Sequence, residues 1–350
     1  MASGADSSAA ARTIRALLIL PSVVYAIIQQ LRTALFVRGI LRSRKLPRPV
    51  ISVGNIAVGG TGKTPVTAYV AGLLQAEGLR VAVLSRGYGG NSEGEVRIVS
   101  DGNEILLSAH ECGDEPFLLA STIPGLMVII GADRYEAGRL AMERLRPDVF
   151  LLDDGYQHQR LQRDLNILLL DYTRPYGNGW CLPAGLLREP RQAVNRADLV
   201  IHTRSPDGAV AQVAGPGIQS CCASHHLNDL IPLGGGPPLE FSFLAGRKVL
   251  AVAGIAEPES FFDGLRERGL NLVWTMIFPD HAGYDTATLN EITDRYRSTG
   301  ADLVVTTEKD GVKLATIPHP LAEKILLCRL TLKLVDPAPV AASLRNLLQK

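Results

Sequence analysis

A glycine-rich segment near the start of the chain, SVGNIAVGGTGKTP at residues 52–65, constrains the fold more than any other feature. It joins an apolar run to an expected helix that opens with Lys63 and Thr64. This context is typical of the P-loop G-x-x-x-x-G-K-[ST], although Ala57 stands where the pattern has its first glycine. Ala57 only has to avoid a positive φ. A turn that needs glycines for its shape alone is the alternative, and the complete context favours a nucleotide site.

The residues of this loop have separate roles in binding a nucleoside triphosphate. The glycines allow backbone N–H groups to approach phosphate oxygens, and the amino terminus of the following helix favours negative charge. Lys63 can reach the β- and γ-phosphates, and the Thr64 hydroxyl can join the coordination of Mg²⁺. The predicted nucleotide-binding residues are Gly59, Gly60, Thr61, Gly62, Lys63 and Thr64.

Short apolar runs alternate with helical stretches from Pro49 onward. This alternation predicts an α/β fold with a P-loop NTPase-like, mostly parallel sheet and helices on both faces. Strands are expected at 49–54, 80–85, 126–130, 148–153, 166–171 and 198–202, with a hairpin at 96–107. A later series at 248–254, 270–276 and 301–307 predicts a second, smaller α/β domain. The expected division is 1–48 for a membrane-associating segment, 49–215 for the P-loop domain, 216–245 for a Gly- and Pro-rich linker, and 246–350 for the smaller domain.

The net charge of +1 conceals a basic amino terminus. Residues 1–50 hold eight basic side chains against the single acid Asp6, so they carry +7 and the remainder carries −6. Within them, residues 16–31 are uncharged and fall short of the ~20 residues that span a bilayer. This pattern favours a helix lying in the membrane interface, with arginines that meet anionic head groups; a helix packed on the protein's own core is the alternative.

Two pairs of acids follow the P-loop. Asp153 and Asp154 end an apolar run, where a P-loop protein places its second metal anchor. One can hold Mg²⁺ while the other positions the attacking group, and a solvated turn is the alternative. Asp114 and Glu115 lie at an expected helix start, where carboxylates either complement the helix dipole or orient an acceptor hydroxyl.

Two further segments supply candidates. Arg188 stands beside Glu189 in NGWCLPAGLLREP (178–190), and an arginine suits a bidentate grip on phosphate. His281 lies in FPDHAGY (278–284) after an expected strand. A lone histidine is more often structural, so the residues alone leave its role open.

Six motifs in this order resemble tetraacyldisaccharide 4′-kinase, the lipid A 4′-kinase family of Gram-negative bacteria. They are SVGNIAVGGTGKTP, SRGYGG, GDEP, DDGYQH, NGWCLPAGLLREP and FPDH. The likeness covers nearly the whole chain, and the family also lacks the usual first glycine of the P-loop. Tyr156 and the Ser/Ala-rich leader are mild departures from it.

The resemblance implies transfer of the γ-phosphate of ATP to the 4′-hydroxyl of tetraacyldisaccharide 1-phosphate, which gives lipid IVA. It implies Asp114 as the base and His281 as its partner, brought together by closure over bound substrate. Asp154 and Glu115 would share in catalysis, and Mg²⁺ would be held by Thr64, Asp153 and Glu115. The residues expected at the substrate are Asn55, Arg86, Tyr88, His158, Arg188 and Glu189.

A substrate with four acyl chains stays in the bilayer, because each buried CH₂ is worth ~0.8 kcal/mol. The expected location is the cytoplasmic face of the bacterial inner membrane, which the five cysteines without C-x-x-C spacing also fit as reduced thiols. The expected partners are the lipid A disaccharide precursor and an anionic membrane surface, with neither nucleic acid nor an obligatory protein partner.

Two other classes of protein remain as rivals. A membrane-associated P-loop switch ATPase would carry a lysine before the paired glycines, where this chain has Val58. A nucleotide-gated adaptor would not need Asp114, Asp153 and Asp154 together.

Overall fold

One hydrogen-bonded sheet of 12 strands runs through the computed structural model, which describes residues 9–212, 214–314 and 321–349. The strand order is β10-β9-β11-β12-β8-β7-β6-β1-β5-β2-β4-β3. The strands are β1 (Val50–Asn55), β2 (Val81–Ser85), β3 (Arg97–Asp101), β4 (Met127–Ile130), β5 (Val149–Asp153), β6 (Leu165–Asp171), β7 (Leu199–Thr203), β8 (Gln219–Pro232), β9 (Lys248–Ala253), β10 (Asn271–Ile277), β11 (Leu303–Thr307) and β12 (Ile325–Leu334). The α/β prediction is confirmed.

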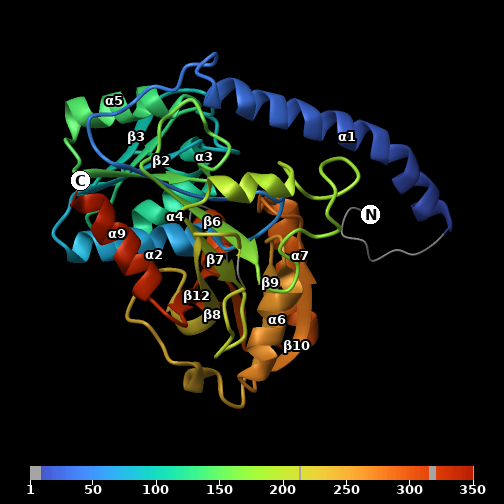
Figure 1. Cartoon of the computed structure of the whole chain (residues 1–350). Helices are drawn as coiled ribbons and strands as arrows, with labels where there is room; N and C mark the ends of the chain where they lie inside the picture. The colour runs from blue at the N-terminus through green and yellow to red at the C-terminus, as the bar shows by residue number, and fades with distance from the viewer. Residues whose placement is uncertain (1–8, 213, 315–320, 350) are drawn as a thin grey trace.

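Helices flank this sheet along the chain (Figure 1). The α-helices are α1 (Ala9–Val37), α2 (Lys63–Ala76), α3 (Ala109–Cys112), α4 (Asp114–Thr122), α5 (Arg134–Arg144), α6 (Pro258–Glu267), α7 (Thr286–Thr299), α8 (Glu308–Leu314) and α9 (Ala338–Leu348). Short 3₁₀ helices occupy Arg191–Arg196, Phe241–Leu244 and Ala322–Lys324. The expected hairpin at 96–107 is reduced to β3 and a single bridge between Ser100 and Ile105.

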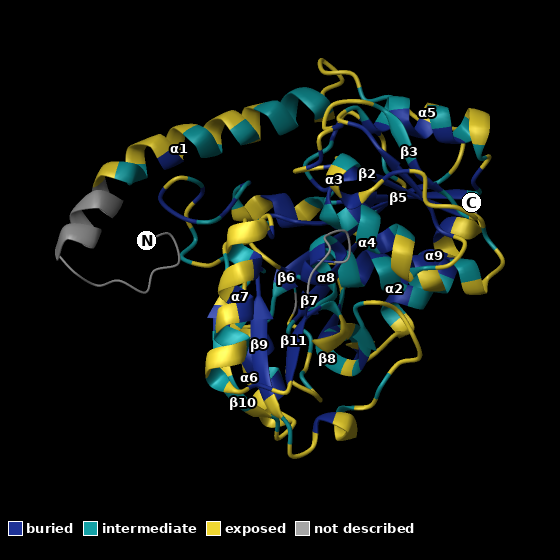
Figure 2. Ribbon diagram, turned by 180° about the vertical axis from the view of Figure 1, so that it is seen from behind, coloured by how far each residue is buried: buried dark blue, intermediate teal, exposed yellow. Residues whose placement is uncertain are grey.

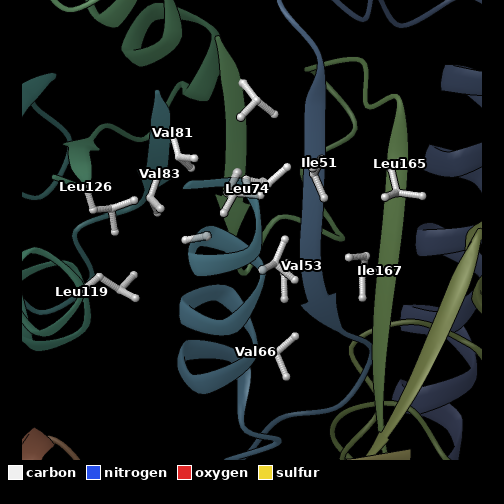
Figure 3. Close-up of a cluster of buried hydrophobic side chains, with 14 of the residues drawn as sticks. Ile51, Val53, Val66, Leu74, Val81, Val83, Leu119, Leu126, Leu165 and Ile167 are labelled. Carbon is white, nitrogen blue, oxygen red and sulfur yellow. The ribbon is translucent and has the colours of Figure 1, made fainter. Parts of the chain in front are cut away.

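The P-loop strand β1 lies between β5 and β6 and pairs in parallel with both. Its six residues are all buried, the pattern of a strand covered on both faces. On one face, Val66 and Leu74 of α2 pack against Ile51 and Val53 in the cluster drawn in Figure 3. This packing brings the carboxyl ends of β1, β5 and β6 to one edge of the sheet, where ligands of such folds bind.

The second series of strands joins the first through β8. This strand pairs in parallel with β7 and antiparallel with β12, so it connects the two halves by backbone hydrogen bonds. The range 216–245, which we expected to be a linker, therefore contains a 14-residue strand. Most of the glycines and prolines that suggested a linker flank the strand, at 215–217 and 234–238, and Pro232 is its last residue.

The carboxyl-terminal helix α9 packs on the first part of the sheet, although the sequence assigned it to the smaller domain expected at 246–350. Its buried side chains Val340, Leu344 and Leu347 belong to the core cluster around α2 and β1. The end of β12 joins the same cluster through Leu334, whereas β9 and α6 pack in a separate cluster that includes Val249 and Phe262. One sheet thus carries two groups of packed helices, one around α2 and one around α6, and α9 belongs to the group around α2 although it comes last in the chain.

Helix α1 extends well beyond the uncharged run at residues 16–31, and much of its described surface is exposed. It has 29 residues, and its Leu17–Val37 segment is long and apolar enough to cross a membrane, by length and composition, with 6% of the tested window buried. Figures 1 and 2 show the helix reaching beyond the body of the molecule, and Figure 2 shows its described surface as a mixture of exposed and intermediate residues. This exposure does not fit the alternative of a helix packed into the core.

Candidate active site

The glycine-rich loop connects β1 to α2 in a conformation that needs its glycines. Gly62 has φ 73° and precedes the first residue of α2, and Gly59 has φ 118°. A Cβ atom at Gly62 would lie 2.6 Å from the ring of His225 on β8. Ala57 is absent from the positive-φ residues of the described chain, so an alanine there causes no strain. The fold thus confirms the strand–loop–helix arrangement, and the ligand roles of the loop residues remain predictions.

The segment that carries Arg188 lies alongside this loop. The backbone N–H of Val58 donates to the carbonyl of Leu186, and that of Arg188 donates to the carbonyl of Ile56. Arg188 Nη1 then reaches Asp154 Oδ2 at 2.7 Å, while Lys63 Nζ lies 3.9 Å from the same oxygen. Two residues far apart in the sequence therefore place their positive charges on the acid beside the P-loop.

Asp153 and Asp154 occupy the carboxyl end of β5, as the sequence predicted. Asp153 is 2% exposed and accepts a hydrogen bond from Thr67 Oγ1 at 3.1 Å. Burial, with Glu115 and Asp154 nearby, raises the pKa of Asp153 to about 7. Asp154 has φ 50°, and its Oδ1 is buried without a partner among the described residues. Asp153 is therefore buried and Asp154 half-buried, which does not fit a solvated turn, and their roles at the site remain predictions.

A buried arginine that sequence reasoning missed lies near these acids. Arg134 opens α5 at the end of β4, is 5% exposed, and donates from Nη1 to the carbonyl of Gly131 at 2.9 Å. Burial lowers its pKa to about 10, against the opposing effect of Asp153 and Asp154. The helix-start pattern GADRYEAG gives no local signal that its arginine lies near Asp153 and Asp154. Only the fold brings the end of β4, which precedes Arg134, close to the end of β5, which carries the two acids.

Asp114 and Glu115 begin α4 immediately after Gly113. Gly113 has φ 89°, and a Cβ atom there would lie 2.5 Å from the carbonyl oxygen of Tyr88. A Cβ at Gly90 would lie 2.4 Å from the carbonyl oxygen of Glu111. The SRGYGG and GDEP motifs therefore pack backbone against backbone, and their glycines fix where α4 begins.

His281 reaches Asp114 from the second half of the sheet. His281 has φ 61°, and its Nδ1 lies 3.2 Å from Asp114 Oδ2. The ring of Tyr88 stands edge-on to it at 5.7 Å between centroids. We expected closure to bring Asp114 and His281 together, whereas in this structure they are already in hydrogen-bond contact.

Two lysines of α8 complete this cluster and were not anticipated. Lys313 Nζ lies 2.9 Å from Asp114 Oδ2, and Lys309 Nζ lies 2.9 Å from Asp280 Oδ1. Figure 2 shows α8 beside α4, and the two helices are in contact. Burial raises the pKa of Asp114, but hydrogen bonds from His281 and Lys313 outweigh burial and hold that pKa below its usual value. The spacing of two lysines four apart after a strand, TTEKDGVK, was the signal available in the sequence.

The expected substrate residues divide into two groups. Tyr88 is exposed and lies beside His281, whereas Arg86 is exposed and pairs with Glu93 at 3.1 Å. Asn55 is fully buried and donates to Thr61 Oγ1, so it shapes the loop. Burial lowers the pKa of His158 to about 4, and its Nε2 has no partner among the described residues.

The assignment of Glu189 to the substrate is wrong on geometric grounds. Glu189 is 1% exposed and accepts two hydrogen bonds from Arg196, at 2.7 and 2.9 Å. It also accepts one from Gln157 Nε2 at 3.1 Å. Glu189 and Arg188 are adjacent in the sequence, but only Arg188 points towards the phosphate loop, while Glu189 is saturated inside the protein.

Comparison with known proteins gives a consistent result. The family model described as tetraacyldisaccharide-1-P 4′-kinase matches residues 14–349. The tetraacyldisaccharide 4′-kinase of Pelobacter propionicus is 60% identical over 350 residues, which cover 100% of this chain and 97% of that protein. The corresponding protein of Geobacter sulfurreducens is 53% identical, covering 99% of this chain and 98% of the relative.

A solved structure supports the same assignment. The crystal structure of the "apo" form of LpxK from Aquifex aeolicus in complex with ATP superposes with a TM-score of 0.82 at 35% identity. The match covers 95% of this chain and 99% of that chain. From the family model, the relatives and this fold, the chain belongs to the tetraacyldisaccharide-1-P 4′-kinase family.

Proposed function

We propose that this protein transfers the γ-phosphate of ATP to the 4′-hydroxyl of tetraacyldisaccharide 1-phosphate, with Asp114 as the group that accepts the hydroxyl proton. The observation that supports this most is the meeting of two clusters at one edge of the sheet. Lys63 and Arg188 bring positive charge to Asp154, and His281 and Lys313 hold Asp114. A phosphate donor and a proton acceptor are the two requirements of a kinase with an alcohol substrate.

The residues present fit a magnesium ion held jointly with nucleotide phosphates. Asp153, Asp154 and Glu115 place negative charge close together, which contributes to the raised pKa of Asp153, and Asp154 Oδ1 is buried without a partner among the described residues. No preformed group of three or more side-chain ligands occurs in the described part of the chain, as expected for an ion that keeps phosphate and water ligands. Thr64, Asp153 and Glu115 would hold the ion, which when bound would neutralise charge on the phosphates.

The side chains then perform separate tasks around the transferred group. Lys63 at the start of α2 binds the phosphates, and the amino terminus of that helix favours their charge. Arg188 holds Asp154 in place and can exchange this contact for a phosphate oxygen. Asp114, kept unprotonated by its two donors, orients the hydroxyl and accepts its proton.

We infer that α1 lies on or in the cytoplasmic face of the bacterial inner membrane. Among its described residues, the exposed large apolar side chains are Leu17, Leu20, Val23, Val24, Ile27, Ile28, Leu31 and Val37. Ser22 Oγ donates to the carbonyl of Cys181 and Tyr25 Oη to that of Arg188, so the helix rests on the segment that reaches the phosphate site. Arg38 and Arg42, exposed in the turn that follows α1, suit anionic head groups. ATP restricts the reaction to the cytoplasmic side.

Transfer of labelled γ-phosphate tests the proposal directly. Purified protein in detergent micelles receives ATP, with and without the disaccharide 1-phosphate lipid, and the lipid is analysed for a second phosphate. Wild type should phosphorylate the lipid, and Asp114→Asn should lose about 100-fold or more in kcat while still binding ATP. Steady ATP hydrolysis at the same rate with and without the lipid would overturn the proposal and favour a switch ATPase.

A further inference from the structure

Two lysines on α8 determine where the protons of the Asp114–His281 pair can reside. Lys309 Nζ lies 3.3 Å from His281 Nε2 and 2.9 Å from Asp280 Oδ1. Lys313 Nζ lies 2.9 Å from Asp114 Oδ2 and 3.0 Å from the carbonyl oxygen of Ala282. Because a lysine ammonium has donors and no acceptor, each of these four partners must accept.

This donor rule fixes the tautomer of the His281 ring. Nε2 faces an ammonium group, so it has to present its lone pair. In a neutral ring the proton is then on Nδ1, which lies 3.2 Å from Asp114 Oδ2 and donates to it. A proton on Nε2 would place an N–H group against a positive charge and break the contact with Lys309.

The contacts also distinguish the two oxygens of Asp114. Both donors, Nδ1 of His281 and Nζ of Lys313, fall on Oδ2. Among the described residues, no hydrogen bond or ion pair involves Oδ1. A carboxylate that receives two donors on one oxygen keeps the other for a third.

We propose that Lys309 is a positioning residue that holds His281 as the neutral tautomer protonated on Nδ1, and that Lys313 acts with it to leave Asp114 Oδ1 for the acceptor hydroxyl. This inference rests on the proposed kinase function. As the hydroxyl oxygen bonds to the γ-phosphorus, the bond from that phosphorus to the β–γ bridging oxygen breaks and ADP leaves. The hydroxyl proton passes to Oδ1, and His281 keeps its own proton throughout.

The arrangement argues against the opposite assignment, in which His281 Nε2 removes the hydroxyl proton. That nitrogen is 3.3 Å from Lys309 and 3.8 Å from Asp280 Oδ2, and the Tyr88 ring lies edge-on to the imidazole. A substrate hydroxyl would have to displace Lys309, which is itself held by Asp280 and lies 3.9 Å from Glu115.

The tautomer is measurable without substrate. The full chain, labelled with ¹⁵N-histidine and held in detergent micelles, gives imidazole ¹⁵N signals from its seven histidines, and His281→Asn identifies the His281 signals. Wild type should show a protonated Nδ1 and an unprotonated Nε2. In Lys309→Met, Nδ1 still faces the Asp114 carboxylate and keeps its proton, but Nε2 loses the opposing ammonium group and should gain a proton as well, so the ring should become protonated on both nitrogens. Lys309→Arg, which keeps a donor, should preserve the wild-type pattern.

Kinetics on the same variants separate positioning from a structural role. Lys309→Met should lower kcat for lipid phosphorylation about 10- to 100-fold with KM for ATP unchanged, and Lys309→Arg should recover most of the rate. Lys248→Met, at an exposed lysine at the amino end of β9, is the matched control and should behave as wild type.

Several results would overturn the inference. These are a wild-type ring protonated on Nε2 or on both nitrogens, an unchanged spectrum in Lys309→Met, or a changed spectrum with unchanged kcat. Failure of the wild type to phosphorylate the lipid would instead refute the kinase function, and the spectrum would still report on the Lys309 contact.

Discussion

Asp153 is expected to destabilise the folded protein at neutral and alkaline pH, because the site buries a carboxylate beside other acids. Its folded-state pKa of about 7 stands against an ordinary value of 3.8. The folded chain therefore binds this proton more tightly than the unfolded chain does, and stability falls as pH rises between these two values. The cost is absent below pH 4 and complete above pH 7.

The replacement Asp153→Asn removes this cost and keeps the hydrogen bond, because the amide oxygen still accepts from Thr67. At 1.36 kcal/mol per pH unit, the two pKa values set an upper bound of about 4 kcal/mol at pH 8. Relaxation and water entry reduce such penalties, so we expect a gain of about 2 kcal/mol. For a chain of this size that corresponds to a rise in Tm of about 2 to 4 °C.

Denaturation in detergent at pH 5, 6, 7 and 8 measures the effect. The gain from Asp153→Asn should grow with pH up to about 7 and then level off. Asp294→Asn, at an exposed acid on α7, is the control and should change stability by less than about 0.5 kcal/mol at every pH. A gain that is independent of pH, or a loss at pH 8, would refute the reasoning. Phosphate transfer should fall in the variant although it is the more stable protein.

Three further outcomes follow from individual contacts. Glu189→Ala removes the carboxylate that pairs with the partly buried Arg196, whose side chain is 19% exposed, and should cost about 2 to 3 kcal/mol in denaturant unfolding because donors of Arg196 are left unpaired. Arg188→Ala should lower kcat with little change in stability. Equal stability of the two variants would contradict the burial of Glu189. Gly62→Ala should weaken ATP binding and cost at least about 1 kcal/mol, because the backbone there is left-handed and the ring of His225 blocks the Cβ. Gly72→Ala, inside the following helix α2 with open space around it, is the control and should be neutral or stabilising. Ile27→Glu on α1 should reduce binding to anionic vesicles about tenfold or more in a sedimentation assay with unchanged ATP affinity, and unaltered sedimentation would speak against α1 as the membrane contact.

The sequence was sufficient for features that depend on local pattern. The P-loop, the buried strands around it and the acids at the end of β5 follow from apolar runs and glycine positions, which act over a few residues. Motif order identified the family. Asp114 and His281 could be paired only through the resemblance, since 167 positions separate them.

Features that depend on long-range pairing were not predictable in this way. The strand β8 was hidden between Gly- and Pro-rich flanks, and its role in joining the halves depends on partners on either side. Lys309 and Lys313 became relevant only when the fold placed α8 against α4. Glu189 was misassigned because adjacency in the sequence says nothing about which of two neighbours turns inward.

The contact of α1 with the segment at residues 181–188 has a consequence for how the enzyme finds its substrate. Ser22 and Tyr25 of the helix donate to the carbonyls of Cys181 and Arg188, so we expect the distance from the helix axis to the phosphate site to change little. On the proposed membrane surface, the phosphate site would then stay at a fixed height above the head groups while the protein diffuses laterally along the membrane. Turnover should accordingly follow the mole fraction of lipid substrate in that surface, and diluting it with inert lipid should slow the reaction even when its bulk concentration is held constant.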